Sequence, residues 1–151
     1  MRHRQAIALL ALIGSFIALY LSLHRVGVIG QLQCGTGACE TVQTSAYAVF
    51  LGIPVAFYGV AGYLALLVVS LVGVQPAWVS RRGPTLLLAV MSGLGFAFTL
   101  YLTYLELFVI HAICRWCVAS AVVIALIFGI SLLCLRTASS TAPPHRDPPA
   151  S

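Results

Sequence analysis

Four long apolar stretches constrain the fold of this chain more than any other feature of its sequence. They run over residues 6–23, 54–74, 84–110 and 113–135. Each holds about the 20 residues that an α-helix, rising about 1.5 Å per residue, needs to cross a bilayer. Hydrocarbon offers backbone N–H and C=O groups no water, so each stretch must satisfy them internally. The sequence therefore predicts an all-α membrane protein, a four-transmembrane-helix bundle.

The composition fits the same class. The chain has 151 residues, of which 61% are hydrophobic and 7% charged, whereas soluble domains carry about 25% charged residues. Its net charge of +5 comes from arginines that lie between the apolar stretches and not in one basic patch. We therefore expect contact with a lipid bilayer and no nucleic-acid partner.

The arginines also predict how the chain crosses the membrane. Arg25 and Arg115 stand alone in two connections, and six others lie before the first stretch, between the second and third, or after the fourth: Arg2, Arg4, Arg81, Arg82, Arg136 and Arg146. Since arginine-rich segments stay in the cytoplasm, both termini are expected there, in a multi-pass protein of the cell inner membrane. The first stretch lacks a small-residue cleavage pattern and is interpreted as a retained anchor.

Four of the five cysteines fall on the side predicted to face the periplasm or cell exterior. Cys34 and Cys39 lie in the long connection after the first stretch, and Cys114 and Cys117 begin the fourth. Cys134, at the cytoplasmic end, is interpreted as a small apolar residue. An oxidising compartment permits disulfides, and two pairs on one side can exchange with each other. This arrangement favours thiol–disulfide exchange.

The second pair has the sequence Cys-Arg-Trp-Cys at the expected start of a helix. Residues three apart share one helix face, so the two sulfurs can bond. The helix N-terminus and Arg115 would both stabilise a thiolate, the species that attacks a disulfide or a quinone ring. The alternatives are a static disulfide or two buried thiols.

The first pair encloses Gly35 and Gly37, which suit an adaptable loop. A shuttle between an external protein and the second pair would need such a loop. One alternative is a disulfide that only staples the loop. Another is a zinc centre of four cysteines, but the spacing is not a repeated C-x-x-C, and we expect no metal.

A short amphipathic helix is predicted on the outer surface, over residues 39–50. Its apolar residues recur at three- and four-residue steps, at Val42, Ala46, Val49 and Phe50. The following Pro54 suits the first turn of the second membrane helix, where a missing N–H costs nothing. Residues 1–136 are therefore expected to form one membrane domain, and residues 137–151, rich in Ser, Thr and Pro, a disordered tail.

Two segments carry a pattern that belongs to a known family. One of them runs from Tyr101 to Cys117 and includes Tyr104, Leu105 and Glu106. The other lies nearer the N-terminus and contains Cys34, Cys39, Glu40, Val42, Ser45, Tyr47, Ala48, Gly52, Ile53, Pro54, Val55, Ala56, Gly59 and Tyr63. Together they resemble bacterial members of the vitamin K epoxide reductase family, in the stand-alone form without a fused thioredoxin-like domain, over residues 6–135.

The resemblance implies an electron relay within a bundle around a quinone site. Cys34 would take electrons from a reduced thioredoxin-fold protein of the cell envelope, and Cys39 would pass them to Cys114 through a mixed disulfide. Cys117 would lie nearest a membrane quinone of the ubiquinone or menaquinone type, and Ser45 matches the family's serine beside the cysteines. Bacterial members of this kind drive disulfide formation in exported proteins.

The quinone pocket is less well defined by the sequence. Where the animal enzymes of the family have an asparagine and a tyrosine that bond the quinone, this chain has Val55 and Ala121. Further candidates for the pocket, beside Cys117, are aromatic rings that could equally pack the bundle or anchor it at the interface: Phe57, Tyr58, Tyr104 and Trp116.

Several questions stay open at this stage. Glu106 and His111 could handle protons or simply reach water near the interface. A quinone or quinone-epoxide reductase that uses protein thiols as electron source, and a cysteine-based metal carrier, are the rival functions. A different four-helix quinone-linked oxidase has its C-x-x-C in the first outer loop, whereas this chain has it in the second.

Overall fold

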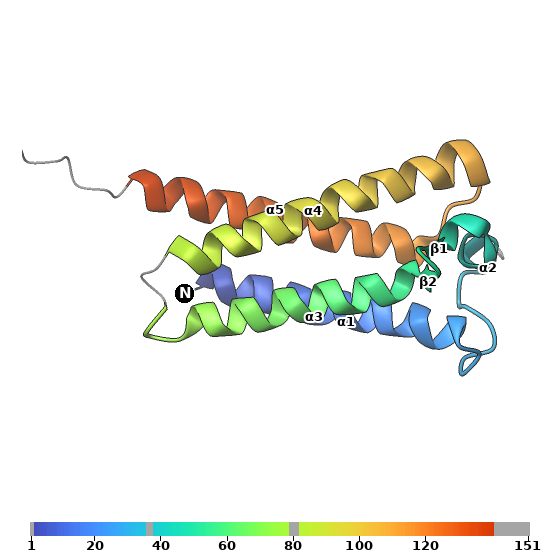
Figure 1. Ribbon diagram of the computed structural model, residues 1–151, viewed down its shortest axis with the longest axis horizontal. Coiled ribbons are helices and arrows are strands. Elements are labelled where there is room, and N and C mark those ends of the chain that lie inside the picture. Colours follow the sequence, from blue (N-terminus) through green and yellow to red (C-terminus); the bar gives the residue numbers. More distant parts are fainter. Residues whose placement is uncertain (1, 36–37, 79–81, 141–151) are drawn as a thin grey trace, which may run out of the picture.

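The computed structural model of the protein describes residues 2–35, 38–78 and 82–140. Four long helices lie side by side and form the body of the molecule (Figure 1): α1 (Arg2–Arg25), α3 (Val55–Val74), α4 (Arg82–Leu105) and α5 (Arg115–Ser140). Each is long and apolar enough to cross a membrane. The predicted four-helix membrane bundle is confirmed, and the chain is a multi-pass membrane protein.

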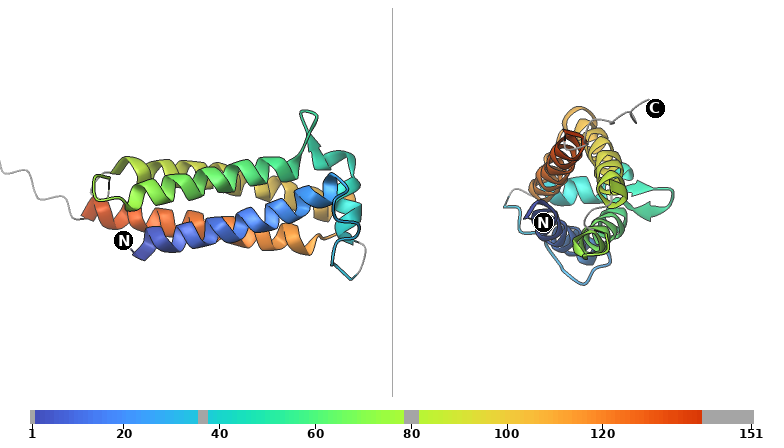
Figure 2. Two further views of the ribbon diagram at one scale, coloured as in Figure 1. Left: turned by 90° about the horizontal axis from the view of Figure 1, so that it is seen from below. Right: turned by 90° about the vertical axis from the view of Figure 1, so that its left-hand side faces the viewer.

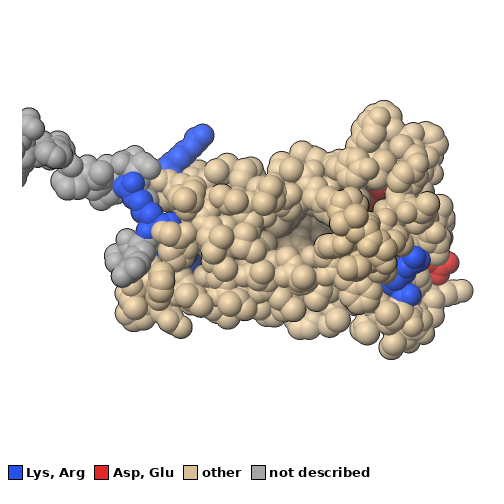
Figure 3. Space-filling view, viewed as in Figure 1, with Lys and Arg blue, Asp and Glu red and all other residues tan. Residues whose placement is uncertain are grey.

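The helices form a closed ring. α1 packs against α3 and α5, and α4 packs against the same two helices, as the end-on view in Figure 2 shows. Figure 3 shows charged side chains near the two ends of the bundle, with an uncharged band between them on the visible face. Lipid can solvate that band, because large apolar side chains are exposed along all four helices.

The end of the bundle where α1 ends and α3 begins is covered by short elements. These are α2 (Ala38–Thr44), a 3-10 turn η1 (Ala46–Ala48), and the strands β1 (Val49–Phe50) and β2 (Ile53–Pro54). The strands pair antiparallel, and both residues of the turn between them, Leu51 and Gly52, have positive φ. Such a turn matches the twist of a hairpin. Figure 2 shows this hairpin projecting from the side of the bundle.

The predicted surface helix is shorter than expected. It ends at Thr44 because Ser45 is extended and its hydroxyl donates to the carbonyl oxygen of Val42, at 2.7 Å. Its buried face is formed by Cys39, Val42 and Gln43, whereas Phe50, which the apolar spacing assigned to that face, is exposed in the hairpin. A local hydroxyl bond thus ended the helix that periodicity would continue.

The ends of the long helices also differ from the expected stretches. The third apolar stretch is not one regular helix: after Leu105 it continues as a π-helical turn, η2 (Glu106–Ile110), which stops at His111 with φ 55°. Pro54, expected in the first turn of α3, lies instead at the N-cap position just before it and makes no side-chain capping bond. Residues 137–140, expected in the tail, continue α5, and residues 141–151 lie outside the described residues.

α1 and α3 approach closely at Gly14. A Cβ atom built on Gly14 would overlap the ring of Tyr63. That ring is buried, and its hydroxyl donates to the carbonyl oxygen of Ser120 at 2.8 Å. Tyr63 therefore links α3 to α5 across the bundle, so its ring cannot easily move aside for a side chain on α1.

We expect Gly14→Ala to lower the free energy of unfolding by about 1–3 kcal/mol, the usual cost of overpacking. Thermal unfolding in detergent would measure the change. Gly129→Ala is the matched control, because a Cβ there meets nothing within 4 Å and alanine is the better helix former. Equal melting temperatures for the two variants would contradict the close contact between α1 and α3.

Candidate functional site

Four cysteines meet at the end of the bundle where α5 begins. Cys34 and Cys39 form a disulfide with their Cα atoms 6.1 Å apart, and Cys114 and Cys117 are free thiols. Cys34, Cys39 and Cys114 belong to one cluster of buried residues, and Cys117 packs against it. The two pairs, more than 70 residues apart in sequence, therefore share one protected site. Cys134 lies elsewhere, late in α5.

Cys114 caps the N-terminus of α5. Its carbonyl oxygen accepts the first helical bond, from the N–H of Val118, and its sulfur accepts the N–H of Cys117 at 3.4 Å. A helix leaves its first N–H groups without partners, and a side-chain acceptor at this position satisfies one of them. The helix start thus holds the two sulfurs on the same turn, as the C-x-x-C spacing predicts.

The environment of Cys114 favours its thiolate. The hydrogen bond from the Cys117 thiol is the main influence that lowers the pKa of Cys114, and the backbone N–H groups of Cys117 and Trp116 lower it further. Burial and the charge of Glu106 act in the opposite direction. Arg115, expected to stabilise the thiolate, is exposed and is not among these influences. The thiolate is therefore stabilised by hydrogen bonds at short range.

Two polar side chains flank the Cys117 sulfur. The amide of Gln43, on α2, donates to it at 3.6 Å. Glu106, the first residue of η2, hydrogen-bonds the Cys117 thiol and accepts the backbone N–H of Cys114 at 3.1 Å. The backbone carbonyl oxygen of Gln43 accepts a hydrogen bond from the Arg25 guanidinium at 3.0 Å, and this bond positions Gln43. Elements from three parts of the chain thus converge on one thiol.

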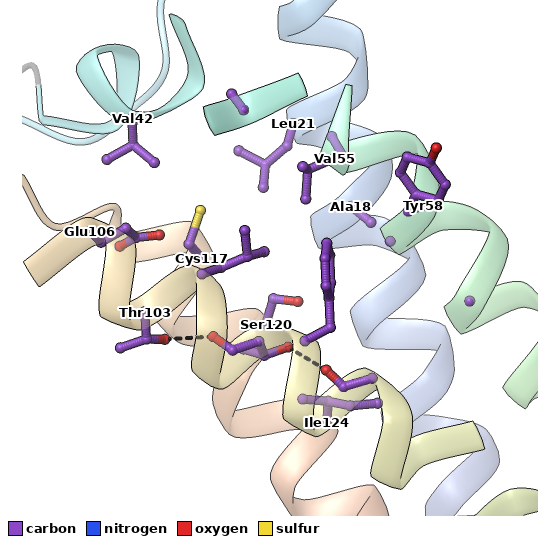
Figure 4. A pocket seen from close by; sticks show the side chains of 18 of the residues that line it. Ala18, Leu21, Val42, Val55, Tyr58, Thr103, Glu106, Cys117, Ser120 and Ile124 are labelled. Atoms are coloured by element: carbon purple, nitrogen blue, oxygen red, sulfur yellow. Dashed lines mark hydrogen bonds between the residues drawn. The ribbon is translucent and has the colours of Figure 1, made fainter. Parts of the chain in front are cut away.

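A cavity of about 210 Å³ begins at this thiol and extends between the helices. Figure 4 shows Cys117 and Glu106 pointing into it beneath Val42 of α2. Figure 3 shows the surface hollowed between α3 and α4, and these two helices supply most of the lining. The walls are largely apolar. The cavity therefore connects the Cys117 sulfur with the lipid-facing side of the bundle.

Several predicted site residues line this cavity, and others do not. Cys117, Ser45, Val55 and Tyr58 are in its wall. The remaining candidates for the quinone pocket lie outside the lining: Phe57, Tyr104, Trp116 and Ala121.

Each of these four residues has an identifiable position. Phe57 and Tyr104 face away from the bundle, and Tyr104 packs on Phe108 with ring centroids 5.0 Å apart. Trp116 packs on Tyr20 at 4.9 Å, on the α1 side of the cluster. Ala121 is next to Ser120, which lines the cavity. One residue along a helix turns the side chain by about 100°, which moves it out of the cavity wall.

The most informative residue that the sequence did not indicate is Gln43. It is polar, 8% exposed, and lies one helical turn after Cys39. The i, i+4 spacing of Cys39 and Gln43 is the signal that would have placed both on one face of α2. His111, in contrast, is exposed, and its Nδ1 pairs with the carbonyl oxygen of Leu107.

The stabilisation of Cys114 predicts a titration. In a protein whose other cysteines are serine, Cys117→Ser keeps a hydroxyl donor and Cys117→Ala removes it. We expect the Cys114 thiolate to persist to a pH about one unit lower in the serine variant, since a hydrogen bond to a charged group contributes about 1.5–3 kcal/mol and one pKa unit is about 1.4 kcal/mol. Ultraviolet thiolate absorbance measures the midpoints, and equal midpoints would contradict the assignment.

The site agrees with the comparison to known protein families. The family model described as the Vitamin K epoxide reductase family matches residues 5–132, which include all four helices up to the last turns of α5. This is a family of membrane oxidoreductases that use quinones. Its match covers well over half of the chain, and the four clustered cysteines fall within it. The chain belongs to the vitamin K epoxide reductase family.

Proposed function

We propose that the protein is a thiol–disulfide oxidoreductase that passes electrons from a reduced thioredoxin-fold partner to a membrane quinone. Cys34 and Cys39 receive the electrons, Cys114 and Cys117 deliver them, and the reoxidised partner drives disulfide formation in exported proteins. One observation carries the proposal: a disulfide and a dithiol share a buried cluster, and one thiol of the dithiol lines an apolar cavity.

The exchange between the pairs follows from thiolate chemistry. The exchange starts with Cys114–Cys117, the inner pair, oxidised and with Cys34–Cys39, the outer pair, reduced. The Cys39 thiolate then attacks the Cys114 sulfur and releases Cys117 as a thiolate. Cys34 then attacks Cys39, which closes the outer disulfide and releases Cys114. Two electrons have moved inward, and one disulfide has been exchanged for another. A Cys34–Cys39 disulfide beside free thiols at Cys114 and Cys117 is the arrangement that these steps would produce.

The cavity suits the ring of a quinone. Its walls are largely apolar, and several of its hydroxyl groups are engaged: those of Ser45, Thr99 and Thr103 donate to backbone carbonyl oxygens, and Tyr63 pairs with Ser120. A quinone bound there would supply an acceptor for two electrons and two protons. Cys117 and Glu106 are the reactive groups of the wall, and the hollow between α3 and α4 would admit an isoprenoid chain from the lipid.

The direction of the site follows from the arginines. In the sequence, six of the eight lie near the start of α1, in or beside the connection between α3 and α4, or late in or after α5, and this excess favours a cytoplasmic position for that end of the bundle. The cysteine cluster lies beside α2 and the start of α5, at the opposite end of the bundle (Figure 1). It would then face the periplasm or cell exterior, where a thioredoxin-fold partner can reach the Cys34–Cys39 disulfide.

Quinone reduction by the purified protein tests the proposal. With a reduced thioredoxin-fold donor and water-soluble ubiquinone and menaquinone analogues, we expect absorbance changes that report quinone reduction coupled to donor oxidation. Cys117→Ala should abolish the reaction, because the thiol beside the cavity is lost. Cys134→Ala should retain the wild-type rate. Failure of the intact protein to reduce any quinone would overturn the proposal, and stoichiometric metal bound to four reduced thiols would indicate a metal carrier instead.

The same assay tests the cavity through Gly62. A Cβ at this lining position meets nothing within 4 Å, so Gly62→Leu fills the cavity without a backbone clash. We expect the KM for the quinone to rise about tenfold or more, because the leucine side chain would occupy space that the quinone needs. Exchange between the donor and Cys34–Cys39 should be unchanged. An unaltered quinone KM would place the quinone elsewhere.

A further inference from the structure

Glu106 is a buried acid that has no role in the proposed transfer of electrons between the cysteines. Its side chain is 5% exposed, although it lies in the helical segment that spans the membrane. It lines the cavity next to Cys117 (Figure 4). An ionisable residue at such a depth is costly to bury and needs a specific explanation.

The local backbone holds Glu106 in place from two directions. Its carbonyl oxygen accepts the N–H groups of His111 and Ala112, which close the π-helical turn. Its carboxylate accepts the N–H of Cys114 at 3.1 Å. Glu106 is therefore fixed to the segment that leads into the redox pair, through both its backbone and its side chain. A π-turn of this kind commonly marks a functional position.

The carboxyl group has no cation to balance its charge. Within residues 2–35, 38–78 and 82–140 no arginine or histidine forms an ion pair with it, and its polar contacts are to Cys114 and Cys117. Burial without a counter-ion disfavours a permanent charge. Such a group can gain and lose a proton according to the state of the thiols beside it.

The proposed reaction requires a proton carrier at this place. When both sulfurs start as protonated thiols, closing the Cys114–Cys117 disulfide breaks two S–H bonds and forms one S–S bond, so two protons must leave the sulfurs together with two electrons. The hydroxyls of Ser45, Thr99 and Thr103 are bonded to backbone carbonyl oxygens. His111 is not in the lining. Glu106 is the carboxyl of the cavity wall, and it touches the thiol.

We propose that Glu106 is the proton-transfer residue of the cavity: it takes each thiol proton and passes it to a quinone oxygen. The inference rests on the proposed function. The Cys117 proton moves directly, and the Cys114 proton follows through Cys117, because the two thiols are hydrogen-bonded. The electron pair passes from the sulfurs to the quinone. Glu106 ends in the protonation state in which it began, so that the thiols and the quinone account for all protons and electrons.

A spectroscopic test requires no quinone. With Cys34, Cys39 and Cys134 replaced by serine, redox-induced infrared difference spectra between the dithiol and disulfide forms of Cys114–Cys117 report carboxyl groups whose protonation or bonding changes. We expect a carboxylic C=O band that disappears in Glu106→Gln and is shifted in Glu106→Asp. Glu40→Gln, which alters the other acid of the described chain, should keep the band. No band, or a band that survives Glu106→Gln, would overturn the proposal.

Kinetics test the same residue in the complete protein. Glutamine at position 106 still accepts the Cys114 N–H bond but cannot carry a proton. We expect Glu106→Gln to slow quinone reduction about 100-fold or more, as for loss of a general acid–base group, with partial recovery in Glu106→Asp. Exchange between the donor and Cys34–Cys39 should stay within about twofold. Quinone reduction by Glu106→Gln at the wild-type rate would overturn the proposal.

Failure of the two proposals can be told apart. If the wild-type protein reduces no quinone, the proposed function fails, whatever the infrared spectra show. If the wild-type protein reduces quinone and the infrared band does not depend on Glu106, only the proton-transfer role fails.

Discussion

The packing of α2 onto the end of the bundle is the contact on which the rest of the site depends. α2 buries Cys39 and Val42 in the same cluster as Cys114, and it brings the amide of Gln43 to the sulfur of Cys117. Arg25, at the end of α1, holds this short helix through the carbonyl oxygen of Gln43. Without this contact, two cysteine pairs distant in sequence would have no common site, and the cavity would open to water.

The cavity follows from unequal packing around the ring of helices. At Gly59 and Gly95 a Cβ atom would lie 3.3 Å from side chains of α1 and α5, which marks close approaches. At Gly62, between α3 and α4, the same atom would meet open space. Small residues therefore draw helices together in one part of the bundle, as is usual in membranes. In another part the same residue type leaves a hollow large enough for an aromatic ring.

Aromatic rings mark the outer edge of that hollow. Phe50 of the hairpin lies 6.0 Å from both Tyr58 and Phe98, measured between ring centroids, and the latter two line the cavity. The hydroxyl of Tyr58 donates to the carbonyl oxygen of Phe50 at 3.1 Å. The hairpin is therefore joined to both helices between which the surface is hollowed.

Apolar length and cysteine position made much of this structure predictable. The four helices are predictable because hydrocarbon offers backbone groups no hydrogen-bond partners. The chain crosses the membrane twice between the two cysteine pairs, so both pairs are predicted at the same end of the bundle. The C-x-x-C at a helix start predicts the thiolate-stabilising cap that Cys114 forms. These inferences depend on composition and spacing along the chain, which a single sequence contains.

The faces of the helices could not be predicted in the same way. In a membrane the lipid-facing side of a helix is as apolar as the side that faces the bundle, so the sequence carries little sign of which rings point inward. Phe57 and Tyr104 were candidates for the pocket and are exposed, whereas Tyr63 is buried. The contact of Gln43 with Cys117 joins residues 74 positions apart, and local patterns do not encode such a contact.

Trapping the bond between the two pairs tests the central claim most directly. In the variant Cys34→Ala/Cys117→Ala/Cys134→Ala, only Cys39 and Cys114 remain, and they are the partners of the proposed exchange. A protease site inserted in the connection between α3 and α4 separates them into two fragments. The account predicts that the fragments stay joined after cleavage without reductant and separate when Cys39 is also changed to alanine. Fragments that separate without reductant in the two-cysteine variant would contradict the account.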